Sequence, residues 1–132
     1  MNAFTLLVQD ATNAQRFSGV TSFVGEDASG SFGILAGHAR MMTTLVVGLA
    51  RFRLGDDAWQ YLALPGAVLY FADATLTLST RRFLLGGDYT RISEELEQQL
   101  VAEEQALRTI KSSLHRMEEE ILKRLWEADR DR

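Results

Sequence analysis

The chain of 132 residues contains no cysteine, a single proline and only two histidines. Without cysteine, it has no disulfide framework, no thiolate metal site and no cysteine nucleophile. The histidines, His38 and His115, lie in different halves of the chain, and neither has a second histidine at the spacing of metal ligands. We therefore expect no metal site and no cofactor.

Long apolar runs are also missing. None reaches the roughly 18 residues that a membrane-spanning helix needs. The N-terminal residues Met1-Asn2-Ala3-Phe4 lack the charged region and long apolar stretch of a signal peptide, and no arginine-rich import leader follows them. We therefore expect a cytoplasmic chain that reaches a membrane only through partners.

The charge balance is mildly acidic, with a formal net charge of −4. No basic stripe of the kind that binds nucleic acid is visible, so we expect no nucleic-acid partner. Apolar residues make up 46% of the chain, which is enough for a core. This length suits one ordinary domain, or one small domain with an appendage.

The first part of the chain predicts a domain of short strands. Turn residues at Gly55-Asp56-Asp57 and Pro65-Gly66 separate segments rich in apolar and β-branched residues. Such closely spaced strands are typical of an all-β sandwich or barrel. The expected strands are Phe4–Gln9, Val20–Val24, Leu45–Leu54, Trp59–Leu64, Ala67–Ala72 and Thr75–Thr80.

The segment Ala67–Ala72 is apolar at every position, although a strand with one face in water would alternate. One interpretation is a central strand, or a strand covered by the chain's own helices. The other is that one of its faces docks onto a partner subunit.

Gly86-Gly87-Asp88 marks a change from strand to helix. Beyond it there is no glycine and no proline, and strong helix formers dominate. We therefore predict a β-sandwich domain at 1–87 and an α-helical domain at 88–132. Ser93 is the expected helix cap. Ile92, Leu96 and Leu100 recur at intervals of four. A second series then follows at threes and fours and resembles a coiled-coil seam: Leu107, Ile110, Leu114, Met117, Ile121 and Leu125.

The number of helices stays open at this point. The seam remains roughly in phase across Ser112-Ser113, which permits one helix from about residue 92 to 129. The same two serines would also suit a turn and a cap within a helical hairpin.

No catalytic constellation emerges from the residues. The spacing of Gly30, Gly33 and Gly37 matches no phosphate-binding loop, and no lysine follows it. The adjacent Asp56 and Asp57 belong to a turn and cannot face one substrate together. His38 is expected to be a turn histidine bonded to nearby backbone, and His115 to lie on a solvated helix face.

The sequence GSFGILAGHAR at residues 30–40, followed by the strand-like Met41–Leu45, closely resembles a known signature. It is G-x-x-G-[IV]-[LY]-P-G-H-A-P-x-x-T, from the epsilon subunit of F-type ATP synthases. Ala36 and Arg40 stand where that family usually has proline, so we expect a loop that is more flexible or differently braced. The resemblance covers the β half well and the helical half only in character.

The resemblance implies a non-catalytic subunit of the central rotor stalk that binds the gamma subunit and the c ring. It would lie on the cytoplasmic side of the cell membrane as a peripheral subunit. It would help couple ion translocation to ATP synthesis or hydrolysis. The family's ATP-binding motif [IL]-D-x-x-R-A is not matched by Ile92-Ser93-Glu94-Glu95-Leu96-Glu97, so we expect no direct nucleotide binding.

The same resemblance supplies candidate contact residues. A loop facing the c ring would comprise Ser31, His38, Ala39, Arg40, Met41 and Met42. Candidates facing gamma are Val68, Leu69, Tyr70 and Phe71. In the family, basic residues of the last helix engage the catalytic head and hold back ATP hydrolysis. Here these would be Lys123, Arg124, Arg130 and Arg132.

Two interpretations from the residues alone stand beside this one. The charges of the last helix also suit a solvated surface with i,i+4 pairs such as Glu119–Lys123 and Glu120–Arg124. The apolar seam from Leu107 to Leu125 also suits a β-domain adaptor that self-associates through its own coiled coil.

Overall fold

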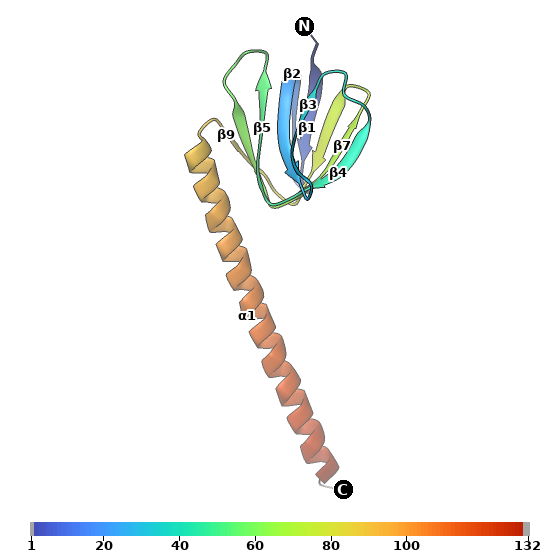
Figure 1. Ribbon diagram of the computed structural model, residues 1–132. Helices are drawn as coiled ribbons and strands as arrows, with labels where there is room; N and C mark the ends of the chain where they lie inside the picture. Colours follow the sequence, from blue (N-terminus) through green and yellow to red (C-terminus); the bar gives the residue numbers. More distant parts are fainter. Residues whose placement is uncertain (1, 131–132) are drawn as a thin grey trace. The chain divides into compact units, whose positions relative to one another are not determined.

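The computed structural model describes residues 2–130, which form a β-sandwich of nine strands followed by one long helix (Figure 1). The predicted fold class is therefore confirmed, and of the two helical arrangements the single helix is observed. The elements are β1 (Phe4–Gln9), β2 (Ala14–Asp27), β3 (Gly30–Leu35), β4 (Met41–Leu45), β5 (Gly48–Leu54), β6 (Gln60–Leu64), β7 (Ala67–Ala72), β8 (Thr75–Ser79), β9 (Leu84–Gly86) and α1 (Tyr89–Arg130).

The strands are hydrogen-bonded in the order β1-β8-β7-β4-β2-β5-β6-β9, with β3 paired to β2. All the pairings are antiparallel except the parallel pair of β1 and β8. Because β1 also pairs with β2, strand β2 joins the two layers of the sandwich. One layer is β1, β8, β7 and β4, and the other contains β5, β6 and β9.

Strand β2 serves both layers because it is long and bends. It has 14 residues, well above the usual five or six. Its first half pairs with β1 and its second half with β3 and β5, and the register of its pairing with β5 shifts between Val20 and Ser22. Just before this shift, Gly19 has a φ of 77°, a left-handed conformation that glycine adopts without a Cβ clash.

The core lies between the two layers and follows from the period-two alternation of the strands. On β1, Phe4, Leu6 and Val8 are buried while the residues between them are half-buried. From the opposite layer, Phe23 and Phe52 are fully buried large side chains. Hydrophobic burial of these side chains provides the main stabilisation of the sandwich.

Strand β7 is a central strand, as one interpretation of Ala67–Ala72 predicted. It pairs with β4 on one edge and with β8 on the other. The expected strand Leu45–Leu54 is wrong in one respect, because it is broken. Leu45 ends β4, the backbone N–H of Val46 donates to the carbonyl of Glu26, and β5 begins at Gly48.

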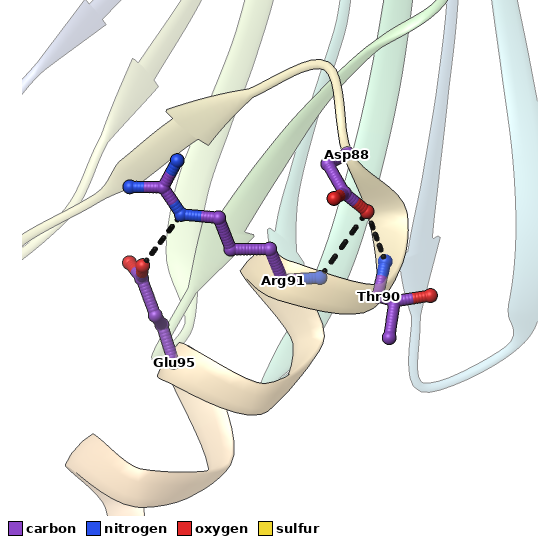
Figure 2. A network of polar contacts seen from close by, with 4 residues as sticks. All are labelled: Asp88, Thr90, Arg91 and Glu95. Carbon is purple, nitrogen blue, oxygen red and sulfur yellow. Dashed lines mark hydrogen bonds and ion pairs between the residues drawn. The ribbon is translucent and has the colours of Figure 1, made fainter.

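Helix α1 begins earlier than the sequence suggested, and its cap is Asp88 rather than Ser93. The Asp88 carboxylate accepts hydrogen bonds from the backbone N–H groups of Thr90 (3.1 Å) and Arg91 (3.3 Å) (Figure 2). The Ile92 N–H donates to the Asp88 carbonyl at 3.1 Å, as the first helical bond requires. The Arg91 side chain also pairs with Glu95. Ser93 lies inside the helix and therefore cannot act as its cap.

The helix then continues without a break to Arg130, and Ser112 and Ser113 lie within it. The described residues form two compact units, one ending at Glu97 and the other beginning at Gln98. The first unit thus includes the start of α1, where Ile92 and Leu96 are buried. The division predicted between residues 87 and 88 remains a prediction.

Candidate interaction surfaces

The loop between β3 and β4, Ala36–Arg40, is braced by contacts of His38. Its backbone N–H donates to the Leu35 carbonyl (3.2 Å), and its ring Nδ1 lies 2.7 Å from the Ala39 carbonyl oxygen. The ring also meets the edge of Phe71, with centroids 5.9 Å apart. The prediction of a turn histidine bonded to nearby backbone is confirmed. These contacts brace a loop that lacks the two prolines.

The structure keeps only part of the proposed c-ring-facing set together. His38, Ala39 and Arg40 are exposed in this loop, and Met41 and Met42 follow directly at the start of β4. Ser31 lies near the other end of β3, opposite Glu26. Ser31 precedes the first loop residue, Ala36, by five positions of extended strand, or about 17 Å. Ser31 borders a different hollow, described below.

The four gamma-facing candidates on β7 fall on two faces. Val68 and Tyr70 are 47% and 37% exposed, whereas Leu69 and Phe71 are 0% and 2% exposed. The prediction is therefore wrong for Leu69 and Phe71, since their side chains belong to the core and cannot reach a partner. Side chains of a strand point alternately to its two faces, so Val68 and Tyr70 share one face and Leu69 and Phe71 the other. The sequence did not show which face is buried, because all four residues are apolar.

The exposed side of β7 belongs to a continuous row of side chains across four strands. Met42 lies directly opposite Tyr70, Tyr70 opposite Thr77, and Thr77 opposite Leu7. In the next row, Val68 stands between Thr44 and Ser79. Met42 is 68% exposed. The structure thus joins the end of the loop segment to the outer face of β7 in one surface, which we call the Met42–Tyr70 face.

The helical unit carries an uncovered apolar stripe. Leu100 is half-buried, and from Leu107 onward the apolar side chains of the seam are exposed. Its exposed members are Leu107, Ile110, Leu114, Met117, Ile121 and Leu125, and Leu122 and Trp126 extend it near the end. Such a stripe is normally buried against a neighbour.

Of the basic candidates of the helix, Lys123 and Arg124 are exposed. Arg124 pairs with Glu120 at 3.1 Å, which confirms one of the two predicted pairs. Glu119 pairs instead with His115, at 3.0 Å, rather than with Lys123. These exposed pairs contribute only tenths of a kcal/mol each. Arg130 is the last residue of α1, and Arg132 lies outside the described residues.

The structure offers no metal centre within residues 2–130, where no group of three or more histidine, aspartate or glutamate side chains could hold an ion. Nor does any helix in this part of the chain have the length and apolar character to cross a membrane. The exposed features are faces and stripes, which suit contacts with other proteins.

Comparison with known proteins agrees with this picture. The family model described as ATP synthase, Delta/Epsilon chain, beta-sandwich domain, matches residues 6–86, which covers β2 to β9 and most of β1. The chain belongs to the epsilon-subunit family of F-type ATP synthases.

Two relatives are ATP synthase epsilon chains. ATP synthase epsilon chain 2 of Cereibacter sphaeroides is 37% identical over 91 residues, which are 68% of this chain and 62% of that protein. The chloroplastic ATP synthase epsilon chain of Pelargonium hortorum is 30% identical over 90 residues, 68% of this chain and 66% of that protein. The similarity therefore spans slightly less than two thirds of each relative.

Solved structures share the fold at low identity. A chain of the Euglena gracilis mitochondrial ATP synthase OSCP/F1/c-ring structure has a TM-score of 0.60 at 16% identity, over 74% of this chain and 64% of that one. A chain of the Tetrahymena thermophila mitochondrial ATP synthase central stalk/cring structure has a TM-score of 0.54 at 12% identity, over 64% and 69%.

Proposed function

We propose that this chain is a non-catalytic subunit of the central stalk of an F-type ATP synthase, where it binds the gamma subunit and the c ring. It turns with the rotor and couples ion movement through the membrane ring to ATP synthesis or hydrolysis. It is peripheral to the membrane, on the cytoplasmic side. In this proposal the β-sandwich domain predicted at 1–87 is the coupling domain, and the α-helical domain predicted at 88–132 is the regulatory one.

The observation that carries this proposal is the Met42–Tyr70 face on a sandwich that the family model matches. Met42, Tyr70 and Val68 present exposed apolar surface beside a loop that keeps the histidine and glycine of the family signature. Exposed apolar clusters with a polar rim are typical of protein contacts. In this arrangement Val68 and Tyr70 face gamma, and the loop at His38–Arg40 faces the c ring.

The test is reconstitution of an ATP synthase that has been depleted of its epsilon subunit and comes from the same source. The full chain should bind the depleted complex and restore ion pumping for each ATP hydrolysed. Val68→Glu and Tyr70→Glu should each weaken binding about tenfold or more, because a carboxylate would be desolvated in the interface. Ala11→Glu adds the same charge at an exposed turn and should bind as the wild type does. A wild-type chain that does not bind would refute the proposal.

A regulatory role of the helix is the finer part of the proposal. Lys123 and Arg124, with Arg130 and Arg132 beyond them, are the residues that would engage the catalytic head and restrain hydrolysis. In the reconstituted complex, Lys123→Ala/Arg124→Ala should raise the rate of ATP hydrolysis. The matched pair Arg108→Ala/Lys111→Ala, on the same helix, should leave it unchanged. Equal rates for the two double variants would make the helix a passive brace.

The exposed apolar stripe supports a second candidate function, a β-domain adaptor that self-associates through its helix. Sedimentation of the full chain separates the two. A dimer or trimer that Leu114→Asp dissociates favours the adaptor, since aspartate in the seam would oppose coiled-coil packing. A monomer that binds the depleted complex favours the central-stalk subunit.

A further inference from the structure

The outer face of β5 and β6 carries a compact aromatic and basic cluster, on the layer of the sandwich opposite to β4 and β7. The guanidinium carbon of Arg51 lies 4.5 Å from the centre of the Trp59 ring, and that of Arg53 lies 5.2 Å from it. Both arginines therefore lie against one indole, in the geometry of cation–π pairs. We call Arg51, Arg53 and Trp59 the arginine–tryptophan cluster.

The two guanidiniums have little compensation for their charge. Among the residues that the structure describes, neither side chain donates a hydrogen bond, and the Nε–H of Arg53 is buried without a partner. The nearest carboxylate to Arg53 is that of Asp56 at 4.0 Å, and its side chain is fully exposed. Such a pair contributes little. The cluster thus holds two arginines in place while leaving their donors open.

A hollow of about 340 Å³ adjoins the cluster. Arg51 lines it together with Tyr61, its direct neighbour across the β5–β6 pair, and with Tyr89. The two tyrosine rings meet edge to face with centroids 5.4 Å apart. The rest of its lining is Val24, Gly25, Glu26, Ser31, Leu49 and Ala50. Arginine, tyrosine and tryptophan are the residue types that contribute most of the binding energy at protein interfaces.

We propose that the arginine–tryptophan cluster and this hollow form a second docking surface, which takes a carboxylate-bearing segment of a partner protein. Aspartate or glutamate side chains of the partner would accept hydrogen bonds from Arg51 and Arg53, and a neighbouring apolar side chain would enter the hollow between Tyr61 and Tyr89. The identity of the partner rests on the proposed function: it is another subunit of the ATP synthase.

The charge of the arginine–tryptophan cluster favours an acidic segment as the binding partner. Guanidiniums offer donors and no acceptor, so they pair with carboxylates in a fork geometry. The indole already holds them in place, which lowers the entropy lost on binding. Glu26 borders the hollow on the β2 side, so the acidic groups of the partner must lie toward Trp59.

The first test measures binding to the epsilon-depleted ATP synthase at low and moderate salt. Arg51→Gln should weaken binding of the full chain about tenfold at low salt and reduce its salt dependence. Arg108→Gln removes the same charge from an exposed position of α1 and should bind as the wild type does. Equal affinities of these two variants, with Val68→Glu still weakened, would overturn this docking surface alone. A wild-type chain that does not bind would overturn the central-stalk proposal and this surface together.

The second test identifies what covers the surface. A photoreactive benzoylphenylalanine at Tyr61 should, in the assembled complex, crosslink to another subunit at a peptide containing aspartate or glutamate. The same group at Tyr70 serves as control for the opposite layer and should label a different peptide. Crosslinks from position 61 that stay within this chain would overturn the proposal, since the chain itself would then cover the hollow.

Discussion

The Ile92 side chain occupies the space in front of Gly86. A Cβ atom at Gly86 would lie 2.9 Å from Ile92 Cδ1 and 3.1 Å from Cγ1. Because Ile92 is buried in the first turns of α1, this contact fastens the start of the helix to the last strand of the sandwich. Gly86 is thus required by packing.

Gly86→Val should therefore destabilise the sandwich by about 1–3 kcal/mol through overpacking. Gly87→Val is the matched control, because the nearest atom to a Cβ there is Gln60 Nε2 at 3.9 Å. Urea unfolding followed by the fluorescence of Trp59, in a Trp126→Phe background, measures both. Equal unfolding midpoints for the two valine variants would contradict the packing argument.

The helix cap of α1 can be tested directly, because the structure assigns it to Asp88 and the sequence pattern predicted Ser93. Asp88→Ala removes an acceptor for two backbone N–H groups and should cost about 1 kcal/mol of unfolding free energy. Ser93→Ala lies inside the helix, where alanine is the better helix former, and should cost nothing. Urea unfolding with circular dichroism compares them, and a larger loss for Ser93→Ala would show that the helix begins at the later position.

Much of the fold could be predicted because single strands carry their own signal. Phe4–Gln9 and Ala67–Ala72 were located at their observed bounds. The first half of β2 was missed, since its residues from Ala14 to Gly19 are nearly all exposed and do not alternate. Its position is fixed by pairing with β1, which no local pattern reveals. The break at Val46 was hidden because the apolar run continues through it.

The candidate surfaces were harder to predict than the strands, because they too depend on contacts between residues far apart in the sequence. The resemblance located the loop around His38, but burial decides that only Val68 and Tyr70 of β7 face outward. The arginine–tryptophan cluster has no sequence signature. Arg51 and Arg53 precede Trp59 across a hairpin turn, and only the antiparallel pairing of β5 and β6 brings them over its ring.

The turn between β7 and β8 contains a residue in a strained conformation. Ala74 has a φ of 58°, in the left-handed region that alanine adopts at a cost of about 1 kcal/mol. Ala74→Gly should relieve this cost and raise the unfolding free energy by about 0.5–1 kcal/mol. Ala28→Gly, at an exposed turn position without a positive φ, should give no gain. Thermal unfolding of both variants measures the difference, and a gain at Ala28 alone would contradict the assignment of strain.

Hydrogen bonds to Asp27, at the end of strand β2, make the stability of the protein depend on pH in acid. A hydrogen bond from the Ser29 hydroxyl, then one from the Ser29 backbone N–H and one from the Thr43 hydroxyl, lowers the pKa of Asp27 below its ordinary 3.8. A carboxyl group with a lowered folded-state pKa stabilises the protein fully above its unfolded pKa. This contribution is lost as the pH falls through the folded-state pKa.

Ser29→Ala should raise the pKa of Asp27 toward 3.8. The stability difference between wild type and variant should therefore be constant above about pH 5 and should shrink as the pH falls below about 4. Carbon NMR titration of the Asp27 carboxyl group measures the pKa, and urea unfolding across pH measures the stability. Ser18→Ala, at an exposed position of β2, is the control. If Asp27 titrates at the same pH in wild type and Ser29→Ala, the Ser29 hydroxyl is not the group that lowers its pKa.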